Sequence, residues 1–302
     1  MKCVSVFFFC MMNLLSCVPL ASDEEYIFSH VEEEVQRMKI LNTAYNGNSL
    51  GELTRNVKAG INMLEFGCGN LELAEELMSK VPNIHYTCID PEKRISHFLS
   101  SFYNRFEHVR LLEGGVEELD KYVGNESFDV IYGRWVLAYV PQQNLASIIQ
   151  DLYRRLSPGG KLILEECDVY KVACLSTNST SHLPECIGLD LWVSLTKNVE
   201  EKSGFGFSLG DKLEDISSAS LEQSAEKIVS YAAVLEGEAK AVPLLGLKSS
   251  KEFLISEGLI SEENMELMIR ELKRMIKDPS ILLKYVNSTL VIFEKNSQYT
   301  EL

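Results

Sequence analysis

The stretch Ile61–Leu71, INMLEFGCGNL, is the strongest indication of the fold of this 302-residue chain. Its apolar start predicts a short buried strand, and Gly67 and Gly69 then turn the chain sharply. Apolar residues at helical spacing begin at Leu71, so the glycines lie between the end of a strand and the start of a helix. Glycine lets the backbone approach a ligand closely, and the N–H groups of a helix N-terminus favour an anionic or acceptor-rich group.

A carboxylate follows the next predicted strand. The apolar-rich run Ile84–Ile89 ends in Asp90 and Pro91, and an acid at the carboxyl end of the second strand is placed to accept hydrogen bonds from two ribose hydroxyls. The glycine turn and this acid together predict a site for a nucleoside cofactor. A nicotinamide cofactor is typically bound by GxGxxG, but no third glycine follows here. Instead Glu65 precedes the turn, which gives the pattern ExGxG.

The pattern ExGxG resembles the first motif of class I S-adenosylmethionine-dependent methyltransferases. Two later segments resemble that family as well. Ser127–Pro141, SFDVIYGRWVLAYVP, is similar to its fourth strand and following loop, and Leu156–Glu166, LSPGGKLILEE, is similar to its PGG turn and fifth strand. The resemblance runs from about Tyr26 to the end of the chain and is most specific between Ile61 and Glu166.

This resemblance implies an α/β, Rossmann-like methyltransferase fold: a mostly parallel seven-stranded sheet with helices on both faces and a helical cap insertion. It implies S-adenosyl-L-methionine as the cofactor. Glu65 would help to place the turn and the methionine end of the cofactor, Asp90 would bind the ribose, and Val116 would pack on adenine. The cofactor-binding residues implied in this way are Glu65, Gly67, Cys68, Gly69, Asp90, Pro91, Gly115, Val116, Glu117 and Arg134.

The chain departs from the family pattern at two positions. The family usually carries an acid before the adenine pocket, where this chain has Gly115, so Glu117 or a backbone group would reach the amino edge of adenine. Leu71 stands at the third glycine of the motif, and its side chain would either point into the core or narrow the pocket. Because of these two differences, an alternative to an enzyme stays open. In that alternative the chain is a catalytically degenerate binding or interaction protein that has the same fold.

The composition bears on the acceptor. A hydrophobic content of 46% with 24% charged residues indicates a globular protein, and a net charge of −15 argues against a nucleic-acid acceptor, which needs clustered Lys and Arg. The sequence also lacks the NPPY-like signature of the family's amide and nucleobase methylators. We therefore expect a small-molecule acceptor, a small organic compound.

The chemistry itself indicates no catalytic residue. Methyl transfer from a sulfonium is an in-line displacement that a protein catalyses largely by positioning the acceptor, and the five histidines indicate no general base. No Cys or His set has zinc spacing, so no metal is expected. Besides a methyltransferase and a degenerate binding protein, a third hypothesis is a nicotinamide oxidoreductase. The pattern ExGxG in place of GxGxxG disfavours it.

Residues 1–22 have the order of a secretory signal, with Lys2, the apolar run Val4–Leu20, small residues and then acids. The run is short for a spanning helix, and Leu14–Cys17 also matches a weak lipoprotein-type cleavage box. A start codon set upstream of Met11 or Met12 is a third interpretation. Membrane contact is expected only through residues 1–22. Cofactor supply favours the cytoplasm, the leader favours export or membrane anchoring, and the sequence indicates no oligomeric state.

The cysteines outside the leader are five, an odd number, so a full disulfide framework is not expected. Cys68 and Cys88 fall in loop and strand positions of the predicted core, whereas Cys174 and Cys186 could pair across an insertion.

Residues 23–302 are predicted to form one methyltransferase domain with a cap insertion at about 168–220. Further expected elements are a helix at Tyr26–Leu41, a turn at Asn46–Leu50, a helix at Ile95–Phe106, a helix from Pro141 to Leu156 ended by Pro158–Gly160, a loop at Asp168–Leu183, a sixth strand at Lys227–Leu235, a helix that Ser261 begins, and a last strand at Thr289–Phe293.

Overall fold

The computed structural model describes residues 32–91, 102–177, 186–204 and 206–296. These residues divide into two compact units, each built from three segments of the chain. Unit 1 consists of the described parts of Met1–Asn46, Asp168–Phe207 and Tyr231–Asn287. Unit 2 consists of the described parts of Gly47–Cys167, Ser208–Ser230 and Ser288–Leu302. The domain bounds expected from the sequence, including the leader and the cap insertion, stay a prediction.

Unit 2 contains the strands β3-β2-β1-β4-β5 and, next in this order, the last part of β8. The pairs β1–β2, β1–β4, β2–β3 and β4–β5 are parallel, and β7 pairs with β8. The strands are β1 (Asn62–Phe66), β2 (His85–Asp90), β3 (Val109–Glu113), β4 (Phe128–Arg134), β5 (Leu156–Asp168), β7 (Lys227–Leu235) and β8 (Ile281–Glu294). With β6, the described residues form an eight-stranded sheet, one strand more than predicted. The predicted Rossmann-like arrangement, a mostly parallel sheet, is confirmed.

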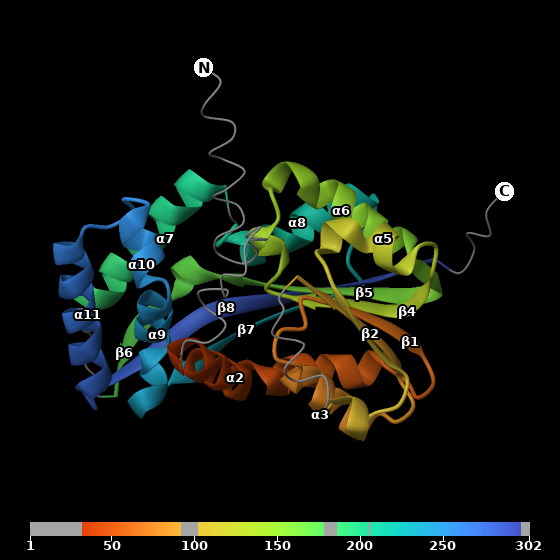
Figure 1. Cartoon of the computed structure of the whole chain (residues 1–302), viewed down its shortest axis with the longest axis horizontal. Helices are drawn as coiled ribbons and strands as arrows, with labels where there is room; N and C mark the ends of the chain where they lie inside the picture. Colours follow the sequence, from red (N-terminus) through yellow and green to blue (C-terminus); the bar gives the residue numbers. More distant parts are fainter. Residues whose placement is uncertain (1–31, 92–101, 178–185, 205, 297–302) are drawn as a thin grey trace, which may run out of the picture. The chain divides into compact units, whose positions relative to one another are not determined.

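Helices cover both faces of this sheet, as Figure 1 shows. Alternate side chains of β1 point to opposite faces, so Leu64 belongs to one apolar cluster and Met63 to the other. The first cluster includes Leu152 of α6 (Gln142–Arg154) and residues of α8 (Leu209–Leu221), and the second includes Leu77 of α3 (Glu72–Lys80). Leu77 and Leu152 are fully buried, and each such burial contributes about 1.5–3 kcal/mol.

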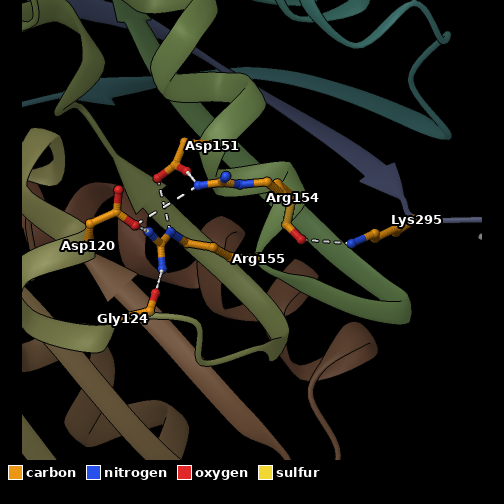
Figure 2. A network of polar contacts seen from close by, with 6 residues as sticks. All are labelled: Asp120, Gly124, Asp151, Arg154, Arg155 and Lys295. Carbon is orange, nitrogen blue, oxygen red and sulfur yellow. Dashed lines mark hydrogen bonds and ion pairs between the residues drawn. The ribbon is translucent and has the colours of Figure 1, made fainter. Parts of the chain in front are cut away.

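The end of α6 is fixed by the buried Arg155, whose side-chain contacts Figure 2 shows. Its guanidinium donates to Asp120 of the short helix α5 (Leu119–Val123), to Asp151 Oδ2 at 3.0 Å and to the carbonyl oxygen of Gly124. Lys295 Nζ donates to the carbonyl oxygen of Arg154 at 2.7 Å. This network connects α5, α6 and the chain just after β8.

The predicted boundary between this helix and the fifth strand was wrong. The helix ends at Arg154 and β5 begins at Leu156, so the predicted Pro158–Gly160 turn lies inside the strand. The physical reason is backbone pairing, because Gly159 N donates to Lys295 O at 2.8 Å and Lys295 N donates to Gly160 O at 2.9 Å. A distant part of the chain therefore pairs with both glycines, although Gly159 keeps a left-handed φ of 77° within the strand.

Unit 1 is mainly helical. Besides part of α2 (Glu32–Asn56) it contains α7 (Ile187–Ser203), α9 (Val242–Ser249), α10 (Lys251–Ser256) and α11 (Glu262–Lys277), and β6 (Ala173–Ser176) pairs antiparallel with the first part of β8. Gly188 lets α7 approach α11 closely, since a Cβ there would lie 2.6 Å from Leu272 N. A disulfide joins Cys174 and Cys186, the pairing that the sequence allowed.

Buried Lys240 fixes the end of α11. Its Nζ donates to the carbonyl oxygens of Met275, Asp278 and Ile281 at 2.9, 2.6 and 2.9 Å. The last carbonyl groups of a helix lack partners within the helix, and here a buried ammonium supplies one. Ser261 is the N-cap of this helix, as predicted, and its Oγ accepts from Asn264 N at 3.3 Å.

Other expected elements differ from the structure. Asn46–Leu50 is not a turn but part of α2, the predicted loop after Asp168 contains β6, and the last strand begins at Ile281 rather than Thr289. The strand at Lys227–Leu235 is confirmed. The first part of the helix expected at Tyr26–Leu41 and most of that expected at Ile95–Phe106 lie outside the described residues.

Residues 1–22 also lie outside them. Within the part of the chain that the structure describes, no helix has both the length and the apolar character needed to cross a membrane.

Candidate cofactor-binding site

The glycine turn follows β1 as predicted. Gly67 and Gly69 have φ values of 70° and 54°, in the left-handed region that glycine tolerates best. Gly67 N donates to Ile89 O at 2.8 Å, which ties the turn to β2. A side chain at Gly67 has no room, because a Cβ there would lie 2.0 Å from Val136 Cγ2. Gly67 therefore meets both requirements for glycine, an unusual backbone angle and a close neighbour.

Leu71 retains the backbone conformation that glycine would supply. Its φ is 62°, and its N–H donates to Cys68 O at 3.0 Å. Its side chain is buried and belongs to the apolar cluster that includes α3. The sequence left two positions open for this side chain, in the core or in the pocket. The structure places it in the core.

The carboxylate of Asp90 lies against the turn. Asp90 ends β2 and is buried, and its Oδ2 accepts a hydrogen bond from Gly69 N at 2.9 Å. Pro91 follows directly. The structure thus brings together Asp90, Gly67 and Gly69, the residues that the sequence predicted to surround a nucleoside.

Glu65 lies at the end of β1, almost fully buried. Its Oε2 accepts a hydrogen bond from the Tyr86 hydroxyl at 2.6 Å. Burial raises the pKa of Glu65 to about 7, with Asp90 adding to the rise, whereas the Tyr86 hydrogen bond and the charge of Arg134 lower it. Burial, followed by the charge of Glu65, raises the pKa of Tyr86 well above its usual value. The Glu65 carboxyl therefore titrates near neutral pH.

A disulfide connects the turn to β2. It joins Cys68, between the two glycines, to Cys88, with the Cα atoms 6.1 Å apart. The sequence did not indicate this bridge, because the two residues fall in separate loop and strand positions. Their proximity depends on the parallel pairing of β1 with β2, which aligns Glu65 with Cys88. Cys167 takes part in neither disulfide.

The segment predicted to contact adenine follows β3. Gly114 N donates to Asp90 O at 3.1 Å, which connects this segment to the end of β2. Gly115 precedes the short 3₁₀ helix η1 (Val116–Glu118), in which the Val116 side chain is buried and Glu117 is exposed. A Cβ on Gly115 would lie 2.7 Å from Glu117 Oε2, so Glu117 lies over the position where the family usually carries its acid.

The ends of β4 and β5 carry a polar network that the sequence analysis missed. Fully buried Glu165 accepts hydrogen bonds from Ser288 Oγ at 2.8 Å, Ser49 Oγ at 3.2 Å and the Tyr132 hydroxyl at 2.8 Å. Arg134 Nη1 donates to Ser49 Oγ at 3.3 Å. Two successive acids at the end of an apolar strand were the available signal, since buried carboxyl groups need such partners.

The second of these acids is Glu166. Its Oε1 accepts from Val136 N at 2.8 Å and from Leu137 N at 2.6 Å. Burial raises the pKa of Glu166 to about 8, the backbone N–H groups oppose this rise, and the nearby Glu165 adds to it. Among the described residues, Glu166 Oε2 is buried without a hydrogen-bond partner.

These features fit an adenosyl cofactor. The ends of parallel strands meet at one edge of the sheet, where open α/β sheets bind ligands. There the chain places two half-buried glycines, the carboxylate of Asp90 and the buried side chain of Val116. No group of three or more metal-ligating side chains gathers among the described residues. The contact of each predicted residue with the cofactor stays a prediction.

Comparisons with known proteins agree with this geometry. The family model of a methyltransferase domain matches residues 63–160. A human tRNA N(3)-cytidine methyltransferase is 27% identical over 128 residues, which cover 41% of this chain and 45% of that protein. A tRNA N(3)-methylcytidine methyltransferase of Schizosaccharomyces pombe is 28% identical over 115 residues, which cover 37% of this chain and 46% of that protein. The chain thus spans less than half the length of these two relatives.

A solved structure shows the same fold. The predicted methyltransferase of Bacillus halodurans C-125 is 17% identical, with a TM-score of 0.51, and the match covers 83% of this chain and all of that one. The matched family model contains the glycine turn, Asp90 and the segments after β3 and β4. Residues 63–160 therefore match a methyltransferase domain, and the fold is that of the class I methyltransferases, whose cofactor is S-adenosyl-L-methionine.

Proposed function

We propose that this chain transfers the methyl group of S-adenosylmethionine to a small organic acceptor. The observation that supports the proposal best is the hydrogen bond from Gly69 N to Asp90 Oδ2, because it joins the glycine turn to the carboxylate at the edge where such sheets bind nucleosides. Leu71 does not obstruct this edge, since its side chain is buried in the core.

The chain's own contribution to the reaction would be binding and orientation. When bound, the cofactor supplies an electrophilic methyl group on a sulfonium. Glu65 and Asp90 would hold the turn around the cofactor, and the buried carboxyl groups of Glu165 and Glu166 would fix the end of β4 beside it. Such positioning is the main requirement for an in-line displacement.

A small organic acceptor is supported by the net charge of −15, which repels a phosphate backbone. A second candidate is a tRNA acceptor. It is supported by the names of the two relatives, both of which are tRNA methyltransferases. The two candidates differ in how salt affects acceptor binding. Binding to tRNA weakens steeply as the salt concentration rises, whereas binding of a neutral small molecule does not.

The first experiment is calorimetry on the full chain with S-adenosylhomocysteine and, separately, with NAD. We expect binding of S-adenosylhomocysteine and none of NAD. Absence of heat and of thermal stabilisation with S-adenosylhomocysteine would favour a binding or interaction protein that kept the fold, and selective stabilisation by NAD would favour an oxidoreductase.

The second experiment supplies cofactor with a labelled methyl group together with either total tRNA or a set of small amines, thiols and hydroxyl compounds. Label in the small-molecule fraction supports the proposal. Label in tRNA alone, lost as salt rises, would replace it with the second candidate.

The cellular location stays a prediction with two alternatives. Cofactor supply favours the cytoplasm, whereas two disulfides are typical of an oxidising compartment. N-terminal sequencing of the protein from its natural source distinguishes them, because export through a cleaved signal would remove about the first 22 residues.

A further inference from the structure

We propose that Glu166 is a positioning residue, which holds the segment Trp135–Leu137 so that Val136 fixes the glycine turn at Gly67. The proposal rests on the proposed function in one respect, the identity of the ligand that the turn binds. The contacts from Glu166 to Gly67 do not depend on that ligand. It assigns to β5 a role in shaping a turn that belongs to β1, through contacts that all lie within unit 2.

The first contact joins Glu166 to the backbone after β4. One carboxyl oxygen, Oε1, accepts from both Val136 N at 2.8 Å and Leu137 N at 2.6 Å. Glu166 is almost fully buried, so bulk water does not reach these hydrogen bonds in the folded chain. Without the carboxyl group, two buried N–H groups would lack an acceptor, which a folded chain avoids by moving the backbone.

The segment needs this support because its conformation is unfavourable. Trp135 has a φ of 56°, a left-handed angle that is rare for a bulky side chain and occurs where surrounding contacts enforce it. Trp135 N donates to Glu165 O at 2.8 Å and its Nε1 donates to Ser288 Oγ at 3.1 Å. Glu165 and Glu166 therefore hold successive amides of the same segment, one through its carbonyl and the other through its carboxyl group.

The second contact joins Val136 to the glycine turn. The Val136 side chain occupies the space beside Gly67, where a Cβ would lie 2.0 Å from Cγ2 and 3.2 Å from Cγ1. A displacement of Val136 would open this space and release the turn. The path from Glu166 to Gly67 thus runs through one backbone segment and one side-chain contact.

The role requires an acceptor oxygen and not a negative charge. Oε1 receives both hydrogen bonds, and Oε2 is buried without a hydrogen-bond partner among the described residues. A proton on the carboxyl group would sit on Oε2, and burial raises the pKa of Glu166 to about 8. Glutamine has the same shape and one acceptor oxygen, so Glu166→Gln should preserve the role, whereas Glu166→Ala should remove it.

The experiment measures S-adenosylhomocysteine affinity by calorimetry and the emission of Trp135 by fluorescence. The chain has two tryptophans, so a Trp192→Phe background leaves Trp135 as the only tryptophan, which is excited selectively at wavelengths where tyrosine does not absorb. Glu166→Ala should weaken affinity about tenfold or more and shift the Trp135 emission to longer wavelength. Glu166→Gln should stay within about twofold of the parent in affinity, since it keeps the accepting oxygen, and should leave the emission unchanged.

The matched control is Asp151→Asn, another acid of unit 2 whose carboxyl group supports Arg155. It should lower the melting temperature without changing either readout, which separates positioning from a general loss of stability. If Glu166→Ala does not fold, Glu166→Asp, which withdraws the oxygen by one methylene, takes its place and should weaken affinity.

Two outcomes would overturn the proposal: a folded Glu166→Ala variant with parental affinity and emission, or a Glu166→Gln variant as impaired as the alanine variant. If the parent itself does not bind S-adenosylhomocysteine, the proposed function fails instead. The Trp135 emission of the same variants would still decide whether Glu166 positions the segment.

Discussion

The amide of Gly69 donates its hydrogen to Oδ2 of Asp90 over 2.9 Å, so the acid predicted to bind the ribose also holds the turn beside it. Replacing Asp90 should therefore have two effects. Asp90→Ala should lower S-adenosylhomocysteine affinity at least about tenfold, because it removes a ribose acceptor and frees the turn. Asp90→Asn, which retains an oxygen for Gly69, should lose less. Calorimetry measures both variants, and unchanged affinity in Asp90→Ala would show that the ribose assignment is wrong.

A methyl group at Gly67 should disrupt the turn. Gly67 has a φ of 70°, where a side chain costs about 1–2 kcal/mol, and the new Cβ would overlap Val136 Cγ2. Gly67→Ala should reduce both the free energy of unfolding and the cofactor affinity. Adding Val136→Ala removes the overlap but not the backbone cost, so the double variant should recover part of the loss. A double-mutant cycle with no coupling would contradict this contact.

Stability should depend on pH through two buried carboxyl groups. Burial raises the pKa of Glu65 to about 7 and of Glu166 to about 8, while both have values near 4.5 when unfolded. Between these values the folded chain binds more protons than the unfolded chain, so each group's contribution to stability is complete below about pH 4.5 and is lost as pH rises through the folded pKa.

Glu166→Gln removes one of these titrations. Relative to this variant, the parent should therefore lose stability as pH rises from 5 to 8, with a slope approaching about 1.4 kcal/mol per pH unit. Urea unfolding at several pH values provides the measurement. Parallel pH profiles for the two proteins would mean that Glu166 has an ordinary pKa.

Lys240 should be essential for the stability of unit 1. Its ammonium satisfies three carbonyl oxygens near the end of α11 in a buried position, so Lys240→Met should reduce the free energy of unfolding by about 3 kcal/mol or more. The matched control is Lys248→Met on α9. Among the described residues Lys248 forms a surface ion pair with Glu33 at 3.2 Å, and its loss should cost less than about 1 kcal/mol. Equal losses in the two variants would contradict the role of Lys240.

The Cys68–Cys88 bridge should stabilise unit 2. It spans 20 residues, and a loop of that size contributes about 3 kcal/mol by restricting the unfolded chain. Under non-reducing conditions the double variant Cys68→Ala/Cys88→Ala should unfold at a lower denaturant concentration than the parent. Reductant breaks two bridges in the parent but only Cys174–Cys186 in the variant, so it should lower the stability of the parent more. Cys167→Ser, outside both disulfides, serves as control. Peptide mapping that finds Cys68 and Cys88 as thiols would refute the bridge.

Local sequence was sufficient for the parts of the fold that short-range chemistry determines. The ExGxG turn and Asp90 at the end of its strand lie as predicted, because strand, turn and helix signals fall within a few residues of one another. The boundary at Pro158–Gly160 was mispredicted, since Gly159 and Gly160 pair with Lys295 and so belong to the strand, although Gly159 keeps a φ of 77°. Likewise, α2 runs through the polar segment Asn46–Leu50, where buried Leu50 and Tyr45 stabilise the helix.

The partners in the polar network at the ends of β4 and β5 could not be predicted from the sequence for a different reason. Glu165 is satisfied by Ser49, Tyr132 and Ser288, which are separated from it by 116, 33 and 123 positions in the sequence. Nothing near Glu165 in the sequence indicates these partners. The same holds for Cys88, whose partner is 20 residues away and is aligned only by the pairing of two strands.

Leu71 shows what kind of signature identifies this turn. A leucine there adopts a φ of 62° and offsets the backbone cost by burying its side chain in the core. A sequence pattern that demanded glycine at this position would overlook the chain, although its backbone follows the same path. Searches for distant relatives should therefore weigh the handedness of the backbone at each position above the residue that occupies it, and accept a large apolar side chain wherever a core lies close enough to receive it.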